Sequence, residues 1–162
     1  MTINITSKTL KFLTILAIIV TLLMLSCTPL VLTAFLKSAY STINPKLVII
    51  ISACIYLCSI PYIIALFKLK SLSNLVIKNT PFSTNTSKLL KSIAFCAFFE
   101  LLLFNGCSLY LVYFHNLFLY AFTVMSMIIV SFICLAISFL CLVLSNVFEE
   151  ATEIKNENDA TI

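Results

Sequence analysis

Hydrophobic residues are concentrated in four long runs along the chain, and short polar segments separate these runs. The runs cover residues 12–36, 47–67, 93–114 and 117–144. A helix needs roughly 20 apolar residues to cross a hydrocarbon core about 30 Å thick, so each run is long enough to span a membrane. Inside lipid the backbone must satisfy its own hydrogen bonds, which a helix does within one segment. The pattern predicts an all-α integral membrane four-helix bundle, formed by a single membrane domain over residues 1–162.

The composition supports this class of protein. Hydrophobic residues make up 62% of the 162 residues and charged residues only 10%, and the mean hydropathy is +1.16. A soluble domain usually carries about 25% charged residues. The basic residues are all lysines and the formal net charge of +4 is spread over short segments. Because nucleic-acid binding needs a basic face or a recognised fold, we expect no direct contact with nucleic acid.

The first apolar run has a second interpretation as a secretory signal. Lys8 and Lys11 precede it, and the residues up to Cys27 faintly resemble a lipoprotein cleavage site. Met24 occupies the position where leucine is usual, and the apolar run continues past the cysteine to Leu36. We therefore favour a retained membrane helix, with a processed lipoprotein as the alternative.

Lysines are unequally distributed between the two ends of the expected helices. The start of the chain, the segment 68–92 and the tail 149–162 together hold eight lysines, whereas the opposite side holds only Lys37 and Lys46. Cytoplasmic segments carry the excess of lysine, so both termini and the middle segment are predicted to be cytoplasmic, in a bacterial cytoplasmic membrane. We expect anionic lipid to contact the lysines of the middle segment, at about 1 kcal/mol each: Lys68, Lys70, Lys78, Lys88 and Lys91.

Small residues recur on one face of each expected helix. Membrane helices associate through close packing of such residues, because lipid gives them no hydrophobic reason to meet. The fourth run has the most regular face, and the third run places Glu100 on its own small-residue face. We therefore expect a single bundle, and assembly of several copies into an oligomer is an open alternative. The face on the fourth run consists of Ser131, Cys134, Ser138, Cys141 and Ser145.

Glu100 is the one ionisable residue well inside an expected span, about 13 Å along the helix from Lys91. A charged carboxylate near the bilayer centre is costly, so such a residue is a candidate functional site. With no lysine in a span to pair with it, we expect a protonated carboxyl or hydrogen bonds to nearby hydroxyls. The alternatives are a proton or cation site and a neutral acid that joins helices. The candidate hydroxyl partners are Tyr56, Ser59, Ser131 and Ser138.

Signatures of enzymes and metal sites are missing from the sequence. The seven cysteines all fall in apolar runs and form no CxxC pair, so we interpret them as small hydrophobic residues. His115 lies in the short turn between the third and fourth runs, where a solvated role is expected. No motif for phosphate binding or metal-assisted hydrolysis occurs. We expect no catalysis, no cofactor and no metal.

The tail is acidic. Glu149, Glu150, Glu153, Glu157 and Asp159 outweigh Lys155, which gives the segment a net charge of −4. The middle segment carries five lysines on the same expected side of the membrane. Attraction between the two segments is therefore one hypothesis, although exposed pairs contribute only about 0–1 kcal/mol each. Lipid contact by the lysines is the alternative that we favour.

The last residues of the tail resemble the ending of a bacterial membrane family, domain of unknown function 2975. Members of the DUF2975 family often end in a stretch similar to IKxENDLTI, and this chain ends in IKNENDATI, with Ala160 in place of the usual leucine. The turn at Phe82-Ser83 and the residues that follow it are also similar to that family. The matching tail residues are Ile154, Lys155, Glu157, Asn158, Asp159, Thr161 and Ile162.

The resemblance implies a four-helix membrane protein of unassigned activity. Members are often encoded beside a small helix-turn-helix regulator, which implies a membrane partner or sensor for a DNA-binding protein. The main functional hypothesis is therefore a non-enzymatic inner-membrane protein that engages such a regulator through its cytoplasmic segment and tail. The alternatives are a small transporter-like or ion-handling protein centred on Glu100 and immunity to a membrane-active peptide.

Overall fold

The structure of the chain is a computed structural model that describes residues 2–39, 45–77, 83–115 and 120–160. In these ranges the chain forms four helices: α1 (Thr2–Ala39), α2 (Pro45–Ile77), α3 (Thr84–His115) and α4 (Tyr120–Ala160). The described ranges contain no strand. Residues 117–119 of the fourth apolar run lie outside the described residues.

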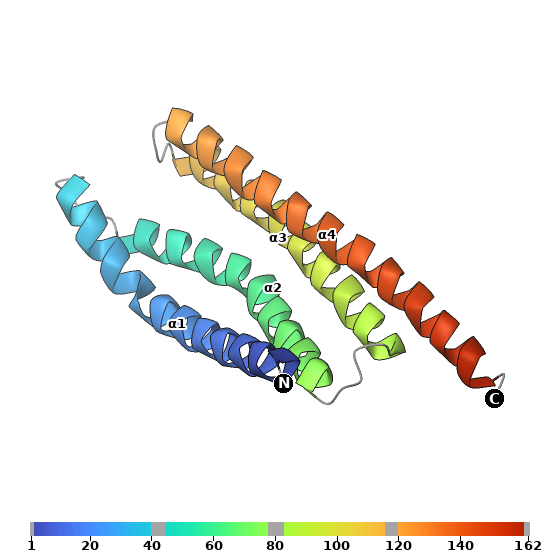
Figure 1. The fold of residues 1–162 in the computed structure, drawn as a ribbon. Helices are drawn as coiled ribbons and strands as arrows, with labels where there is room; N and C mark the ends of the chain where they lie inside the picture. The colour runs from blue at the N-terminus through green and yellow to red at the C-terminus, as the bar shows by residue number, and fades with distance from the viewer. Residues whose placement is uncertain (1, 40–44, 78–82, 116–119, 161–162) are drawn as a thin grey trace.

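Each of the four described helices is long and apolar enough to cross a membrane. This finding confirms the predicted class, and the chain is a multi-pass membrane protein. The helices extend well beyond the apolar runs at the end of the molecule that holds both termini (Figure 1). An even number of spans places both termini on one side of the membrane, and their cytoplasmic location stays a prediction.

Each helix packs against its neighbour in the chain. Close backbone approaches join α1 to α2, α2 to α3, and α3 to α4 within the described ranges. Figure 1 shows the result as two long hairpins, α1–α2 and α3–α4, joined along α2 and α3. A small buried cluster of Leu36, Val48 and Ile51 holds one end of the first hairpin, and Leu111 of α3 packs against it.

Large apolar side chains cover the outside of the helices. Phe95 on α3, and Phe132 and Phe139 on α4, are among the most exposed, at 72%, 74% and 71%. A soluble protein rarely exposes a continuous apolar surface of this kind, whereas in a bilayer these side chains contact lipid. The outward apolar surface therefore agrees with four membrane spans.

Two helices contain a proline well inside their length, Pro29 in α1 and Pro61 in α2. Proline has no N–H to donate, and its ring clashes with the carbonyl four residues earlier, so helices bend at such positions. Both α1 and α2 change direction partway along in Figure 1. Pro61 itself is buried, which places the bend of α2 inside the contact with its neighbours.

The small-residue face predicted on the fourth run packs against α3. The amide of Asn105 donates to Ser131 Oγ at 2.9 Å. Ser138 donates to the Ala94 carbonyl at 3.1 Å, in a contact where both helices approach closely. These hydroxyls join helices instead of bonding only to their own backbone, so the prediction of a packing face on this helix is confirmed.

Candidate functional site

Glu100 lines a cavity between α2 and α3, near the middle of both helices. The cavity has a volume of about 320 Å³, which is at the lower end of the roughly 300–1,000 Å³ typical of small-molecule sites. Its walls are mainly apolar and carry few polar groups besides the Glu100 carboxyl. The side chains that bring polarity or thiols to it are Cys54, Cys58, Ser59, Tyr62, Cys107 and Ser108.

The carboxyl of Glu100 is incompletely satisfied. The carboxyl lies near the backbone of α2 at Tyr62. One carboxyl oxygen, Oε2, is buried and has no hydrogen-bond partner among the described residues. A buried carboxyl oxygen without a partner carries an energetic cost, so its position needs an explanation beyond packing.

The hydroxyls expected to bond to Glu100 have other partners. Tyr56 donates to the Leu25 carbonyl of α1 at 3.2 Å, and Ser59 donates to its own helix at the Tyr56 carbonyl. Ser131 and Ser138 are engaged with α3 at Asn105 and Ala94. The prediction of these hydroxyls as partners of Glu100 was therefore wrong. Sequence spacing places the hydroxyls at the depth of Glu100, but it does not show which neighbouring group each hydroxyl contacts.

Three thiols share the cavity with Glu100. Cys54 and Cys58 are one turn apart on α2, and Cys107 of α3 lines the same cavity. All seven cysteines are free, and the described residues contain no group of three ligating side chains placed to hold a metal ion. The thiols therefore serve here as compact, weakly polar walls.

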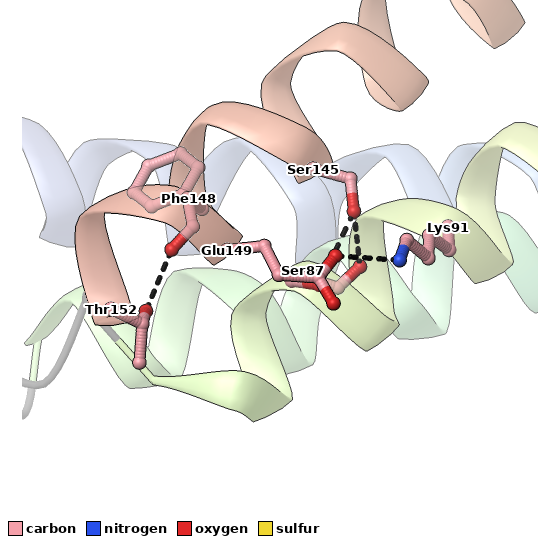
Figure 2. A network of polar contacts seen from close by, with 6 residues as sticks. All are labelled: Ser87, Lys91, Ser145, Phe148, Glu149 and Thr152. Carbon is pink, nitrogen blue, oxygen red and sulfur yellow. Dashed lines mark hydrogen bonds and ion pairs between the residues drawn. The ribbon is translucent and has the colours of Figure 1, made fainter. Parts of the chain in front are cut away.

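A second polar cluster joins α3 and α4 at the end of the molecule where the tail begins (Figure 2). Ser145 is fully buried, and its hydroxyl donates to the Ser87 carbonyl at 3.0 Å. One turn further along each helix, Lys91 Nζ and Glu149 Oε2 form an ion pair at 2.6 Å. Ser87 also donates to the same carboxylate at 3.4 Å. The cluster fixes the first turn of the tail to α3.

The attraction expected between the tail and the middle segment therefore involves one lysine in the described part of the chain. Lys91 pairs with Glu149. Lys68 and Lys88 instead line a separate polar cavity between α2 and α3, and Lys70 lies on α2 outside that cavity. Lys78 lies outside the described residues. The middle segment is also mostly helical, because α2 continues to Ile77 and α3 begins at Thr84.

The remainder of the tail continues as helix beyond this cluster. Ile154, Lys155 and Glu157 are exposed, with Ile154 at 67%. The backbone of Asn158 and Asp159 is helical, whereas their side chains, and Thr161 and Ile162 entirely, lie outside the described residues. In Figure 1 the red end of α4 extends past the first turn of α3.

The electrostatic state of Glu149 follows from its neighbour. The hydrogen bond from Lys91 and its positive charge hold the pKa of the Glu149 carboxyl below its ordinary value of 4.5. The residue lies beyond the last apolar run, which ends at Leu144, so it is outside the membrane-spanning part. The side chains of both partners are 48% exposed, and solvent therefore weakens the pair.

We expect the substitution Glu149→Gln to lower stability at neutral pH and to lose this effect in acid. The unfolded chain binds the proton at a higher pH than the folded chain, so the ion pair stabilises fully above pH 4.5 and less as the pH falls through the folded pKa. The measurement is the unfolding midpoint of both proteins between about pH 3 and pH 8 in one detergent. Glu150→Gln is the matched control, because Glu150 forms no ion pair in the described chain. Equal pH profiles for the two variants would contradict the expectation.

Comparison with known proteins identifies a family for this chain. Residues 32–162 match the model of a family described as a protein of unknown function, DUF2975. The match covers α2, α3 and α4 completely, and it includes both polar sites described above. No curated protein and no solved structure matches the chain.

Proposed function

We propose a function from the geometry of this chain itself, because the chain belongs to the DUF2975 family and the description of that family assigns no activity. The proposal is a non-enzymatic protein of the bacterial cytoplasmic membrane. The part of α4 after the last apolar run, residues 145–160, lies on the cytoplasmic side and is called the α4 extension here. It binds a small helix-turn-helix regulator and holds it at the membrane. The membrane spans keep the protein in the bilayer, and the tail contacts the regulator.

The observation that carries the proposal is the division of the α4 extension into two faces. Ser145, Glu149 and Thr152 form one stripe, which is directed to α3: Ser145 and Thr152 are buried, and Glu149 pairs with Lys91. The opposite stripe, which we call the tail face, has the same helical spacing and is exposed. The tail face consists of Val147, Glu150, Ile154 and Glu157.

The chemistry of the tail face indicates the kind of partner. Val147 and Ile154 are 55% and 67% exposed, and two carboxylates lie beside them. An amphipathic helix with a few apolar anchors is a common form of protein recognition. Surrounding carboxylates favour a basic partner through charge complementarity. A DNA-binding regulator has such a basic surface, and family resemblance implies that one is often encoded nearby.

Site-specific photo-crosslinking in native membranes tests this proposal. A photoreactive residue at position 154 lies on the tail face. One at position 156 lies on the same turn but on the opposite side of the helix. We expect a helix-turn-helix protein to crosslink from position 154, much less from position 156, and to be identified by mass spectrometry. A chain that ends after Thr152 is the matched truncation, because it keeps Ser145, Glu149 and Thr152 and hence the contact with α3. We expect it to lose the partner.

Two results would argue against the regulator. Crosslinks from position 154 to lipid alone, at equal expression, would remove the partner from the proposal. A partner that the chain ending after Thr152 still retains would place the binding surface elsewhere on the protein. The protein's helical content and elution volume must match between variants, so that loss of folding is not read as loss of binding.

A second candidate function is supported by the unpartnered Glu100 oxygen in the cavity between α2 and α3. A carboxyl that faces a cavity within the membrane is suited to bind a proton or cation, and such residues mark ion pathways. Glu100→Gln keeps the size of the side chain and removes its acid function. Loss of proton-linked flux in reconstituted vesicles, with the fold intact, is the result that this candidate requires.

A further inference from the structure

A second cavity between α2 and α3 lies at the end of the molecule where the polar segments begin. It has a volume of about 400 Å³, and its walls are more polar than those of the cavity around Glu100. Four of its seven lining residues carry side-chain N–H donors, and none is acidic. The lining residues are Lys68, Ser71, Asn74, Leu75, Asn85, Lys88 and Leu89. The walls therefore favour an anion.

The lysines of this cavity lie at the level of the lipid headgroups. Lys68 directly follows the apolar run 47–67, and Lys88 precedes the run 93–114 by five residues, or about 7 Å along a helix. Lysine side chains near the ends of membrane helices extend their ammonium groups to the interface. Both charges therefore lie where phospholipid phosphates are found.

These two lysines are available to bind a ligand, in contrast to Lys91. Lys91 is neutralised by Glu149 of α4, whereas neither Lys68 nor Lys88 forms an ion pair within the described ranges. Ser71 donates its hydroxyl hydrogen to the Phe67 carbonyl of its own helix, so the donors left for a ligand are the lysines and the amides. The amides of Asn74 and Asn85 approach the cavity from two different helices. Phosphate oxygens accept hydrogen bonds from both amides and ammonium groups.

We propose that this cavity binds the phosphate of an anionic phospholipid headgroup, with Lys68 and Lys88 as its two cationic ligands. A soluble phosphate ester offers the same oxygens, but two features favour a lipid. The site lies at the membrane interface, and Leu89, which follows Lys88 on the side toward the membrane, gives apolar contact to the glycerol. A net anionic lipid is preferred over a zwitterionic one because both charges in the wall are positive.

Binding is measured on the purified, delipidated full chain by native mass spectrometry, with phosphatidylglycerol and phosphatidylcholine as probes. We expect tighter binding of phosphatidylglycerol, and a decrease of about thirtyfold in that affinity for the double variant K68Q/K88Q, from two interfacial lysines. K70Q is the control, because Lys70 lies on the same helix outside the cavity, and it should lose at most about fivefold in affinity, the general effect of one interfacial lysine. K68R/K88R keeps both charges and should also retain binding.

Three outcomes would overturn the proposal. An equal decrease in K70Q and K68Q/K88Q would mean that charge acts without a defined site. Equal affinity for the two lipids would remove the role of the lysine pair. Saturable binding of glycerol 3-phosphate without phosphatidylglycerol binding would assign the cavity to a soluble phosphate. If K68Q/K88Q fails to fold, Asn74→Leu with Asn85→Leu tests the same wall, and unchanged lipid affinity in that variant contradicts the site.

Discussion

Replacing Glu100 with methionine is expected to raise the free energy of unfolding by about 1–3 kcal/mol. Methionine is unbranched and of similar length, so it fills the same space between α2 and α3 without a polar atom that needs a partner. The buried Oε2 of Glu100 has no hydrogen bond among the described residues, and its removal ends that cost. Unfolding midpoints in one detergent, measured at one pH, give the comparison.

The control for this substitution is Ser108→Ala, which changes another wall of the same cavity. We expect it to change stability by less than about 0.5 kcal/mol. If Glu100→Met instead lowers stability, the carboxyl joins the helices through bonds worth more than its burial costs, and the candidate ion site loses its support. If stability rises while proton-linked flux persists in both Glu100→Met and Glu100→Gln, flux does not depend on this residue and the ion-handling function is wrong.

A general property of functional residues explains why Glu100→Met is expected to raise the free energy of unfolding. A protein keeps a destabilising polar group when its activity needs that group, so substitutions that raise stability at a site often remove its function. Glu100 has the features of such a residue: it lies inside a span, one oxygen is unpartnered, and a cavity is directly beside it. A purely structural carboxyl would be expected to use both oxygens.

The sequence predicted the spans because their signal is strong and local. Four apolar runs of sufficient length leave few alternatives in a membrane, and all of them lie within helices wherever the structure describes them. The face from Ser131 to Ser145 was also predictable, because small residues at steps of three and four direct one side of α4 to a neighbour. The sequence could not predict which helix that neighbour is, because the order of the helices in space depends on contacts between residues far apart in the sequence.

The polar contacts illustrate what pattern reasoning misses. Tyr56 and Ser59 were reasonable partners for Glu100 by depth, but in the structure they bond to backbone carbonyls, which are available in every helix. The pairing of Lys91 with Glu149 was one of many combinations of five lysines with five acids. Spacing gave no signal for this pair, because α3 and α4 run antiparallel and lead Lys91 and Glu149 in opposite directions from the Ser87–Ser145 contact. The ion pair forms because the long lysine side chain reaches back to the carboxylate.

The contact between Ser145 and Ser87 leads to the second large effect. Substituting Ser145 with leucine is expected to lower the free energy of unfolding by about 2–3 kcal/mol. Ser145 is fully buried, and its hydroxyl lies 3.0 Å from the Ser87 carbonyl, so α3 and α4 are nearly in backbone contact here (Figure 2). A leucine side chain cannot fit in that space, and it also removes the bonds to Ser87. The helices must separate, or the side chain must adopt a strained rotamer.

Separation at this point should also release the tail. The ion pair between Lys91 and Glu149 lies one turn beyond Ser145, and Thr152 is buried two turns beyond it. We therefore expect faster proteolysis after residue 149 in Ser145→Leu, together with the lower unfolding midpoint. Asn146→Leu is the matched control, because it adds the same side chain at the next, exposed position. Ser145→Ala should cost much less, about 0.6 kcal/mol for one lost interhelical hydrogen bond. Equal unfolding midpoints and equal proteolysis rates for Ser145→Leu and Asn146→Leu would mean that α3 and α4 do not pack together at Ser145. The tail face would then have no contact with α3 that fixes its orientation.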